Sequence, residues 1–372
     1  MLFACVAAAA AQNVEQSEKI DPFVMPSARA FATGGHHAAF SDDFNVFFSN
    51  PALLATIEPE FSLAEFSLEF IDFGVAGLLF NHVTNTPSES SVLYAKNSKE
   101  SGLHAGGPLA LGVIRKNWGI GAFNITRFHL AWTSDDKQLA NITSTEEFLI
   151  TGGYGRTLFN KGGVSADAGL SLKAFFRAGF LQAIWYPDLK YFLERTNNAT
   201  IETQLGGGVD AGVRLRIGPA ALGLVMRDAY TAVYKSNFIN MEAFNAGEEL
   251  FGGMVSIMPR LAFGLLVSPE PPFWKHIISG FRITLDFHQM LFFLEQDYRS
   301  PLLELGVGFE VTLNNTFSFR MGLYEMLPTA GFGLRLGLFQ FDITAGLREF
   351  GQNIWEYPTL TVLVGVLYRY KK

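Results

Sequence analysis

Seven residues of this 372-residue chain have side chains that together could hold a molecule with an acidic head and a greasy tail. Arginine can bind a carboxylate through two parallel hydrogen bonds, and thioethers and aromatic rings line adaptable apolar pockets. The candidate ligand-binding residues are Phe175, Met254, Met258, Arg260, Leu266, Arg320 and Arg335. The same residue types also fill gaps and form ion pairs within a wall, so a bracing role stays open beside the binding role.

Enzymatic chemistry has little support in this sequence. The chain contains no Gly-x-Ser-x-Gly or His-Glu-x-x-His motif, no cysteine pair and no phosphate-binding glycine loop. His36 and His37 are adjacent, and neighbouring side chains on an extended chain point in opposite directions, so the pair makes a weak metal site. We therefore predict no catalysis, no metal and no cofactor. A net charge of -7 also argues against nucleic-acid binding.

The elements that must position these residues are strands. Between Leu303 and Leu313 the odd positions are apolar, whereas glycine, glutamate or threonine occupies the even positions. Side chains alternate between the two faces of a strand, so each such run has one greasy face and one small or charged face. The chain is 49% hydrophobic and only 17% charged, with 36 Phe and 37 Gly. This combination predicts an all-β fold, a transmembrane antiparallel β-barrel with a lipid-facing exterior and a polar interior.

Turn spacing predicts about fourteen strands. Thirteen fall near residues 104–115, 118–130, 145–158, 163–176, 201–217, 220–231, 251–267, 279–291, 302–313, 316–324, 331–338, 341–348 and 359–370, and one more lies within 61–80. Longer connections are expected at 132–146, 178–200, 232–250 and 326–330 among others. Bacterial barrels have an even number of strands, which returns both termini to the periplasmic side.

The inward face of these strands carries charges of both signs. Because unpaired charge in a narrow lumen is costly, we expect these groups to pair around the wall. Pro259 interrupts an otherwise well-patterned strand and predicts a kink or a local bulge in the wall, since proline cannot donate to the strand ladder.

The N-terminal part divides into two pieces. Residues 1–11 are apolar and end in small residues, as in the remnant of a secretory signal peptide, so that its single cysteine, Cys5, would be removed. Residues 12–59 lack lasting period-two alternation and predict a periplasmic or plug segment ahead of a barrel domain at 60–372. In this segment Gly34 and Gly35 permit a tight turn, and Asn50 with Pro51 predicts a capped helical turn.

Motifs in this segment give the chain a family resemblance. Ala28-Arg29-Ala30, Gly34-Gly35, Asp42-Asp43 and Asn50-Pro51-Ala52-Leu53, together with the hairpins of 301–346, resemble FadL-type outer-membrane transporters of long-chain fatty acids and their PorV-like relatives. The resemblance implies a fourteen-strand barrel whose N-terminal hatch is formed by these residues. It also implies passive uptake of hydrophobic molecules by hatch rearrangement and lateral exit through a kinked wall, or, in PorV-like members, binding of a protein partner.

Three hypotheses follow for a barrel in the bacterial outer membrane with periplasmic termini. The first is a passive transporter whose partners are membrane lipid and a hydrophobic small molecule, most specifically a long-chain fatty acid. The second is a PorV-like barrel whose extracellular loops bind a surface or secretion partner. The third is a small-solute porin.

Overall fold

The computed structural model describes residues 17–18, 23–41, 43–72, 100–132, 139–185, 199–269, 277–291 and 299–371. The predicted signal remnant at 1–11, Asp42 and residues 73–99 lie outside these residues. None of the helices in the described part of the chain has the length and apolar character needed to cross a membrane.

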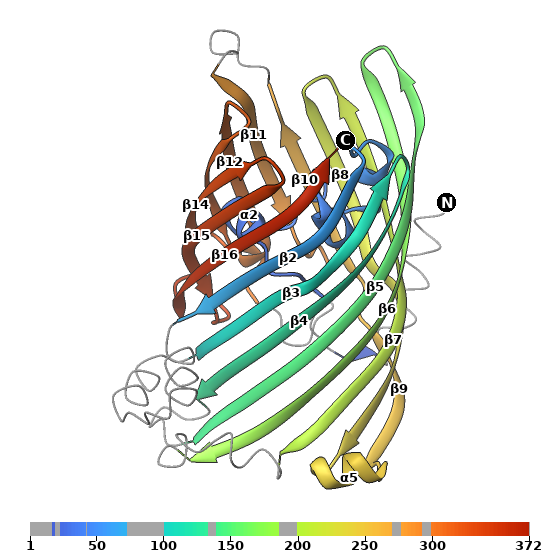
Figure 1. Cartoon of the computed structure of the whole chain (residues 1–372), viewed down its shortest axis with the longest axis vertical. Coiled ribbons are helices and arrows are strands. Elements are labelled where there is room, and N and C mark those ends of the chain that lie inside the picture. Colours follow the sequence, from blue (N-terminus) through green and yellow to red (C-terminus); the bar gives the residue numbers. More distant parts are fainter. Residues whose placement is uncertain are drawn as a thin grey trace.

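One antiparallel sheet closes on itself to form a barrel (Figure 1). Its strands are β2 (Glu60–Ile71), β3 (Glu100–Arg115), β4 (Trp118–Trp132), β5 (Leu139–Lys161), β6 (Val164–Trp185), β7 (Thr200–Ile217), β8 (Ala220–Phe238), β9 (Phe251–Ile257), β10 (Arg260–Val267), β11 (Ile278–Phe287), β12 (Leu305–Leu313), β13 (Phe317–Tyr324), β14 (Leu327–Leu336), β15 (Phe339–Glu349) and β16 (Pro358–Lys371). Pairing of β16 with β2 joins the two ends of the sheet. A short 3-10 turn, η6 (Pro301–Glu304), precedes β12.

β9 and β10 share one position in the wall. The strand stops at Ile257 and resumes at Arg260, and both halves pair with β8. The closed barrel therefore has fourteen wall positions, as the alternating pattern predicted. The two-residue strand β1 (Ser17–Glu18) pairs in parallel with β9.

The two ends of the barrel differ. At the short-turn end, the tight connections include Asn117 and the Asn314–Asn315 pair, all with the left-handed backbone that such turns require. At the long-loop end, β6 and β8 run beyond the predicted loop starts, and a short helix, α5 (Met241–Ala246), follows β8. The predicted long connection at 326–330 is wrong, because Glu325 and Met326 alone turn the chain, both at positive φ.

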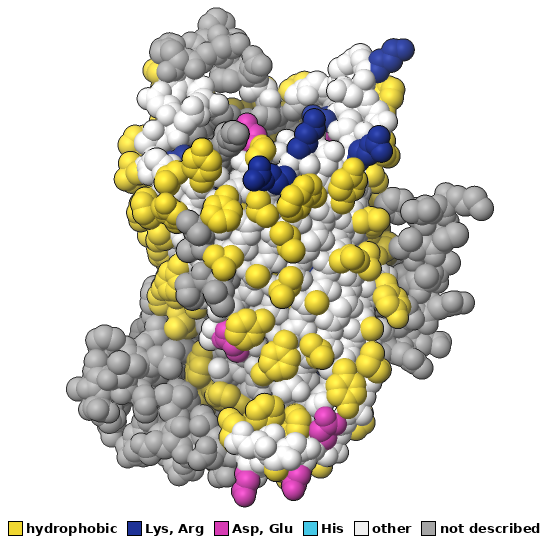
Figure 2. All heavy atoms as spheres, turned by 45° about the vertical axis from the view of Figure 1, so that its right-hand side comes forward, with side chains coloured by type: hydrophobic (Ala, Val, Ile, Leu, Met, Phe, Trp, Pro, Cys, Tyr) yellow, Lys and Arg dark blue, Asp and Glu magenta, His cyan; other side chains and the backbone are white. Residues whose placement is uncertain are grey.

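The outer surface of the barrel is apolar. Figure 2 shows hydrophobic side chains over the middle of one face, with most of the charged groups toward its two ends. Leu172 on β6 is 65% exposed, and Ile150 and Ile343 also point away from the interior. A surface of this kind is stable only against hydrocarbon, which agrees with a membrane-spanning barrel.

Residues 23–41 and 43–59, which we call the luminal segment, lie inside the ring. They form α2 (Ala28–Ala32) and the 3-10 turns η2 (Phe44–Phe48) and η3 (Pro51–Ala55). The side chains of Ser27, Asp43 and Asn50 cap the three elements in turn. Asn50 accepts a hydrogen bond from the Ala52 amide at 2.9 Å, so this predicted capped turn is present. Gly34 and Gly35 both adopt positive φ, as the predicted tight turn requires.

Two parts of the luminal segment pack against different sides of the wall. α2 packs on β13 to β16, while η3 packs on β5, β6 and β7. A Cβ atom added at Gly169 would come within 2.4 Å of the Pro51 backbone, so this wall glycine allows close approach. An apolar cluster joins Phe44, Phe47 and Leu53 to wall residues such as Phe123 and Ile125. Burial of these side chains holds the segment at the short-turn half of the lumen.

Candidate functional site

A cavity of about 570 Å³ lies between the luminal segment and the long-loop end of the barrel. We call it the vestibule. Its floor comes from the stretch between Val24 and His36, and its walls come from strand ends that are far apart in the sequence. Four arginines and four glutamates are among its lining residues, namely Arg127, Arg177, Arg299, Arg348, Glu69, Glu147, Glu325 and Glu349. The arginines and glutamates that line the vestibule are therefore equal in number.

Most of these charges are paired across neighbouring strands. Glu147 lies 3.0 Å from both Arg127 and Arg177. Glu69 binds the His104 ring at 2.7 Å through one oxygen and Arg348 at 3.1 Å through the other. Such pairs offset the cost of holding charges away from bulk water, which confirms the predicted pairing of inward charges.

One side of the vestibule combines accessible cations with an apolar strip. The side chains of Arg299 and Arg348 are both 29% exposed, whereas Arg177 is only 9% exposed. Beside them, the Phe31 and Tyr324 rings meet edge to face at 5.1 Å, and Leu363 packs on the same cluster. A guanidinium group next to aromatic and aliphatic side chains suits a molecule with an anionic head and an apolar chain.

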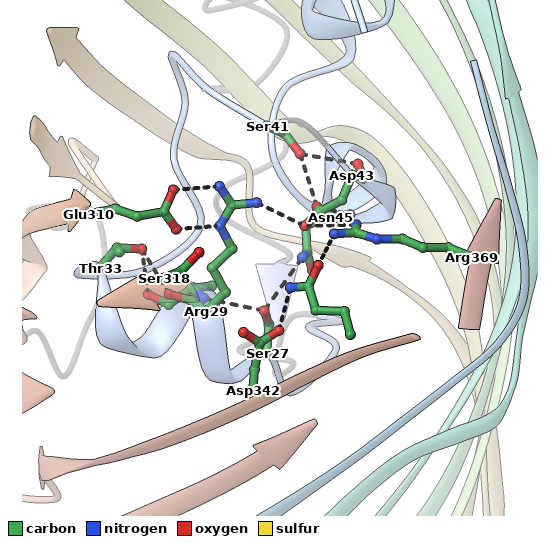
Figure 3. A network of polar contacts seen from close by, with 12 residues as sticks. Ser27, Arg29, Thr33, Ser41, Asp43, Asn45, Glu310, Ser318, Asp342 and Arg369 are labelled. Atoms are coloured by element: carbon green, nitrogen blue, oxygen red, sulfur yellow. Dashed lines mark hydrogen bonds and ion pairs between the residues drawn. The ribbon is translucent and has the colours of Figure 1, made fainter. Parts of the chain in front are cut away.

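Below the floor, a polar network fixes α2 to the wall (Figure 3). Arg29 donates to both oxygens of Glu310, at 3.0 and 2.9 Å, and reaches Asp43 at 3.3 Å. Arg320 bridges Glu310 at 2.7 Å and Asp342 at 2.5 Å. Every member of this network is nearly or fully buried, so it joins the luminal segment to β12, β13 and β15 as one unit.

Wall hydroxyl groups add further bonds to α2 and the residue after it. Thr344 donates to the Ala28 carbonyl at 2.7 Å, Thr329 to the Ala32 carbonyl at 3.2 Å, and Thr284 to the Thr33 carbonyl at 3.3 Å. The stretch just before α2 is held differently. The polar contact that the structure gives for the Val24 carbonyl is with Arg127 at 3.3 Å, and Phe23 and Met25 pack through apolar contacts.

The wall is interrupted where β9 gives way to β10. β10 pairs with β11, but within the described residues β9 has no ladder with β11 and has only Ser17 and Glu18 on that side. Pro259 lies in the break, at the position of the predicted kink, and has no amide hydrogen to donate. Behind the break, Val255 and Ile257 face the apolar cluster inside the barrel. We call this place the wall gap.

The structure places the seven predicted ligand-binding residues in several different surroundings. Met254 is 67% exposed on the outer surface, so the prediction that it faces inward is wrong. The break at 258–259 shifts the alternation by one residue, so that odd positions face inward on β9 and even positions on β10. Met258 lies in the break itself, whereas Arg260 and Leu266 are on the inward face of β10.

The other three predicted residues face inward, but they do not form one group. Phe175 is buried in the apolar cluster and contacts Phe23, with ring centroids 5.9 Å apart. Arg320 belongs to the buried network, and Arg335 lies at the short-turn end, where both line one small cavity. The seven residues therefore do not form the single greasy pocket that the sequence suggested.

Of the predicted hatch residues, Arg29 and Asp43 belong to the polar network, and Gly34 and Gly35 form the turn between α2 and the next stretch. Asn50 holds η3 in place by donating to the Ala38 carbonyl at 2.7 Å and to the Val213 carbonyl at 3.2 Å. Pro51, Ala52 and Leu53 are buried against the wall. Asp42 lies outside the described residues.

Sequence reasoning missed most of the vestibule. Its charged residues sit at the long-loop ends of strands, where alternation is weakest, and their pairs are remote in sequence. One signal was present. Arg348 occupies an inward-facing position of the alternating pattern, and it lies at the end of β15, next to the loop that follows this strand. Phe40, whose ring lies close to the guanidinium groups of Arg29 and Arg282, gave no periodic signal.

Comparisons with known proteins support the fold. The sequence matches no protein-family model. No curated protein matches it in sequence. The structure is similar to that of the Ralstonia pickettii toluene transporter TbuX, with a TM-score of 0.52 and 11% identity over 93% of this chain and 98% of that chain. It is also similar to the CymD monoaromatic hydrocarbon channel, with a TM-score of 0.50 and 10% identity over 95% and 99% of the two chains. At these identities the likeness concerns the fold alone, and it confirms the predicted β-barrel.

Proposed function

We propose that this chain, whose barrel has the FadL-type fold, is a bacterial outer-membrane protein that passively admits hydrophobic molecules with an acidic head, most specifically long-chain fatty acids. The observation that carries the proposal is the continuity of the apolar cluster, which meets the vestibule at Met25 and the wall gap at Ile257. In this proposal both termini lie on the periplasmic side, so that the vestibule opens to the cell exterior. TbuX and CymD, by their names, handle toluene and monoaromatic hydrocarbons.

The vestibule supports capture of the acidic head. Arg299 and Arg348 are accessible and lie beside the Phe31, Tyr324 and Leu363 strip. A carboxylate can bind the open side of these guanidinium groups, because both arginine side chains are 29% exposed, whereas their glutamate partners are buried. The alkyl chain then covers the strip and displaces water from it.

The route onward passes the stretch 23–26. Met25 both lines the vestibule and belongs to the apolar cluster, and Phe23 packs on Phe175. Beyond these residues the cluster reaches Val255 and Ile257 at the wall gap. Local displacement of 23–26 would join the vestibule to the gap and release an apolar molecule sideways into the membrane.

Uptake of labelled oleate by cells lacking their own fatty-acid transporter tests this proposal. Cells that make the protein should take up oleate faster than cells with an empty vector, and equal rates would refute the proposal. Replacing both Arg299 and Arg348 by Gln should raise the half-saturating oleate concentration and leave toluene uptake unchanged. Arg335→Gln, at the opposite end of the lumen, is the matched control.

A second candidate function is recognition of a protein partner, as in the PorV-like alternative. The observation that favours it is the apolar surface around α5 at the long-loop end, where Ile239, Met241 and Leu250 are exposed next to Glu248 and Glu249. Purification from native membranes in mild detergent tests this function. Recovery of the protein alone, without a stoichiometric partner, would count against it.

A further inference from the structure

Four neighbouring cavities lead through the lumen, from the vestibule to a cavity lined by β11 to β15. The vestibule is the first, and cavities of about 20, 10 and 90 Å³ follow it toward the short-turn end. Each cavity shares lining residues with the next: Ala30, Gly35 and His36 at the first junction, Thr33, His37 and Phe40 at the second, and Arg29, Arg282 and Glu310 at the third. The middle cavities have room for about one water molecule each.

Polar atoms line this route, unlike the route to the wall gap. His36 Nδ1 is buried at the first junction and has no hydrogen-bond partner in the described structure. Burial, with the Arg227 cation nearby, lowers the pKa of His36 to about 3, so the ring is neutral. Buried polar atoms normally have partners, so this nitrogen indicates that the route holds polar contents.

Phe40 closes the narrowest part. Its ring lies 4.4 Å from the Arg282 guanidinium carbon and 5.3 Å from that of Arg29. Guanidinium groups close to an aromatic ring hold it in place without filling the space around it. Because Phe40 follows α2 and is separate from the stretch 23–26, this closure is independent of the one proposed for the lateral route.

The last cavity is strongly cationic. Arg29, Arg282, Arg320 and Arg335 line it, while Glu310 is the only acidic residue among its described lining residues. The hydroxyl groups of Ser279 and Ser318 lie between them. A narrow opening lined by one sign of charge concentrates ions of the opposite sign.

We infer that this series of cavities is a second permeation route, which conducts small inorganic anions and short carboxylates along the barrel axis and is held nearly closed by Phe40. It is distinct from the lateral exit of apolar molecules. The route does not depend on the proposed fatty-acid function, because its conduction can be measured with chloride alone.

Conductance across planar lipid bilayers tests the inference. In a potassium chloride gradient, Phe40→Ala should give larger single-channel conductance steps than the native protein. Its reversal potential should show that chloride is more permeant than potassium. Phe319→Ala, an aromatic truncation on the outer surface, should not change the steps. Steps no larger than those of the native protein, or a preference for potassium, would overturn the inference.

The cationic cavity is tested by adding Arg335→Gln to Phe40→Ala. The chloride preference should fall about threefold, as expected for loss of one unit charge about 7 Å from a hydrated ion in water. Lys161→Gln, at a turn of the same end but outside the cavity lining, should leave the preference unchanged. An equal loss in both variants would refute the role of the cavity.

A chemical measurement covers the case in which Phe40→Ala does not fold. In a Cys5→Ser background, Phe40→Cys should react faster with a small anionic sulfonate thiol reagent than with a trimethylammonium reagent of similar size. The ratio is corrected by the rates of the two reagents with a free thiol in solution. A corrected ratio at or below one would overturn the inference.

Discussion

Truncation of Met25 should open the lateral route more often. Met25 is 1% exposed in the apolar cluster, and its thioether lies over Gly106 of β3, where an added Cβ would come 2.7 Å from the methionine methyl group. In the proposed mechanism this side chain leaves the cluster whenever the stretch 23–26 is displaced. Met25→Ala therefore destabilises the closed state without changing a residue of the barrel wall.

The size of the effect follows from burial. Replacing a fully buried methionine by alanine costs about 2–5 kcal/mol in a packed core. If the variant loses about 2 kcal/mol of this stabilisation in the closed state and none in the open state, the open population rises roughly 30-fold. Each 1.4 kcal/mol changes the equilibrium constant between the two states about tenfold. When opening limits transport, uptake at low substrate concentration rises in proportion to that population.

The assay is the initial rate of labelled oleate uptake well below saturation, normalised to the amount of folded protein in the outer membrane. Met226→Ala is the matched control, because Met226 is also buried, at 3% exposure, but belongs to the wall strand β8. Met25→Ala should increase uptake, and Met226→Ala should not. Unchanged or lower uptake in Met25→Ala, or an equal rise in both variants, would refute the proposed role of this stretch.

Three further predictions concern the barrel and its contents. Arg320→Met should lower the free energy of unfolding by about 3–5 kcal/mol in urea titrations, because it removes the cation that pairs with the buried Asp342 and one of those that pair with Glu310. The exposed Arg156→Met should change it little. Leu172→Arg, halfway along β6, should cost about 2–4 kcal/mol in lipid, and Leu158→Arg, near the turn, about 0–1 kcal/mol; equal costs would contradict a membrane-spanning wall. Gly169→Val should displace η3 and expose the luminal segment to trypsin. Gly152→Ala should not, because no atom lies within 3.4 Å of the added carbon. Equal resistance of the two variants to trypsin would argue against the close packing at Pro51.

Sequence predicts the wall of this protein well because alternation is a local property. The run from Leu305 to Leu313 places every side chain on a face before any partner strand is known. The caps at Asn50 and Asp43 are equally local, since each side chain binds an amide two residues ahead. These features need no knowledge of distant contacts.

The parts that sequence did not predict depend on distant or irregular geometry. Met254 was assigned to the wrong face because two residues at 258–259 leave the ladder, and alternation cannot be carried across such a break. The connection at Glu325 and Met326 was expected to be long, but these two residues make a tight turn. Both adopt positive φ, which non-glycine residues rarely do, so the residue types gave no sign of the turn. Arg348 and Glu69 are 279 residues apart, so only the closed ring brings the vestibule together.

The contacts of the luminal segment also indicate which part of it can move. Releasing α2 would break three hydroxyl-to-carbonyl bonds, about 1 kcal/mol each. It would also break the buried pair of Arg29 with Glu310, which adds to this cost although Arg320 and Arg282 remain beside Glu310. Displacing 23–26 mainly exposes Phe23 and Met25, at about 1.5–3 kcal/mol each. Transport should therefore proceed with α2 in place. A disulfide between Ala32→Cys and Gly331→Cys tests this, because the two Cβ positions lie 2.8 Å apart and need to separate by only about 1 Å to form the bond. Oleate uptake should survive oxidation of this pair, whereas loss of uptake that a reducing agent restores would show that α2 itself must move.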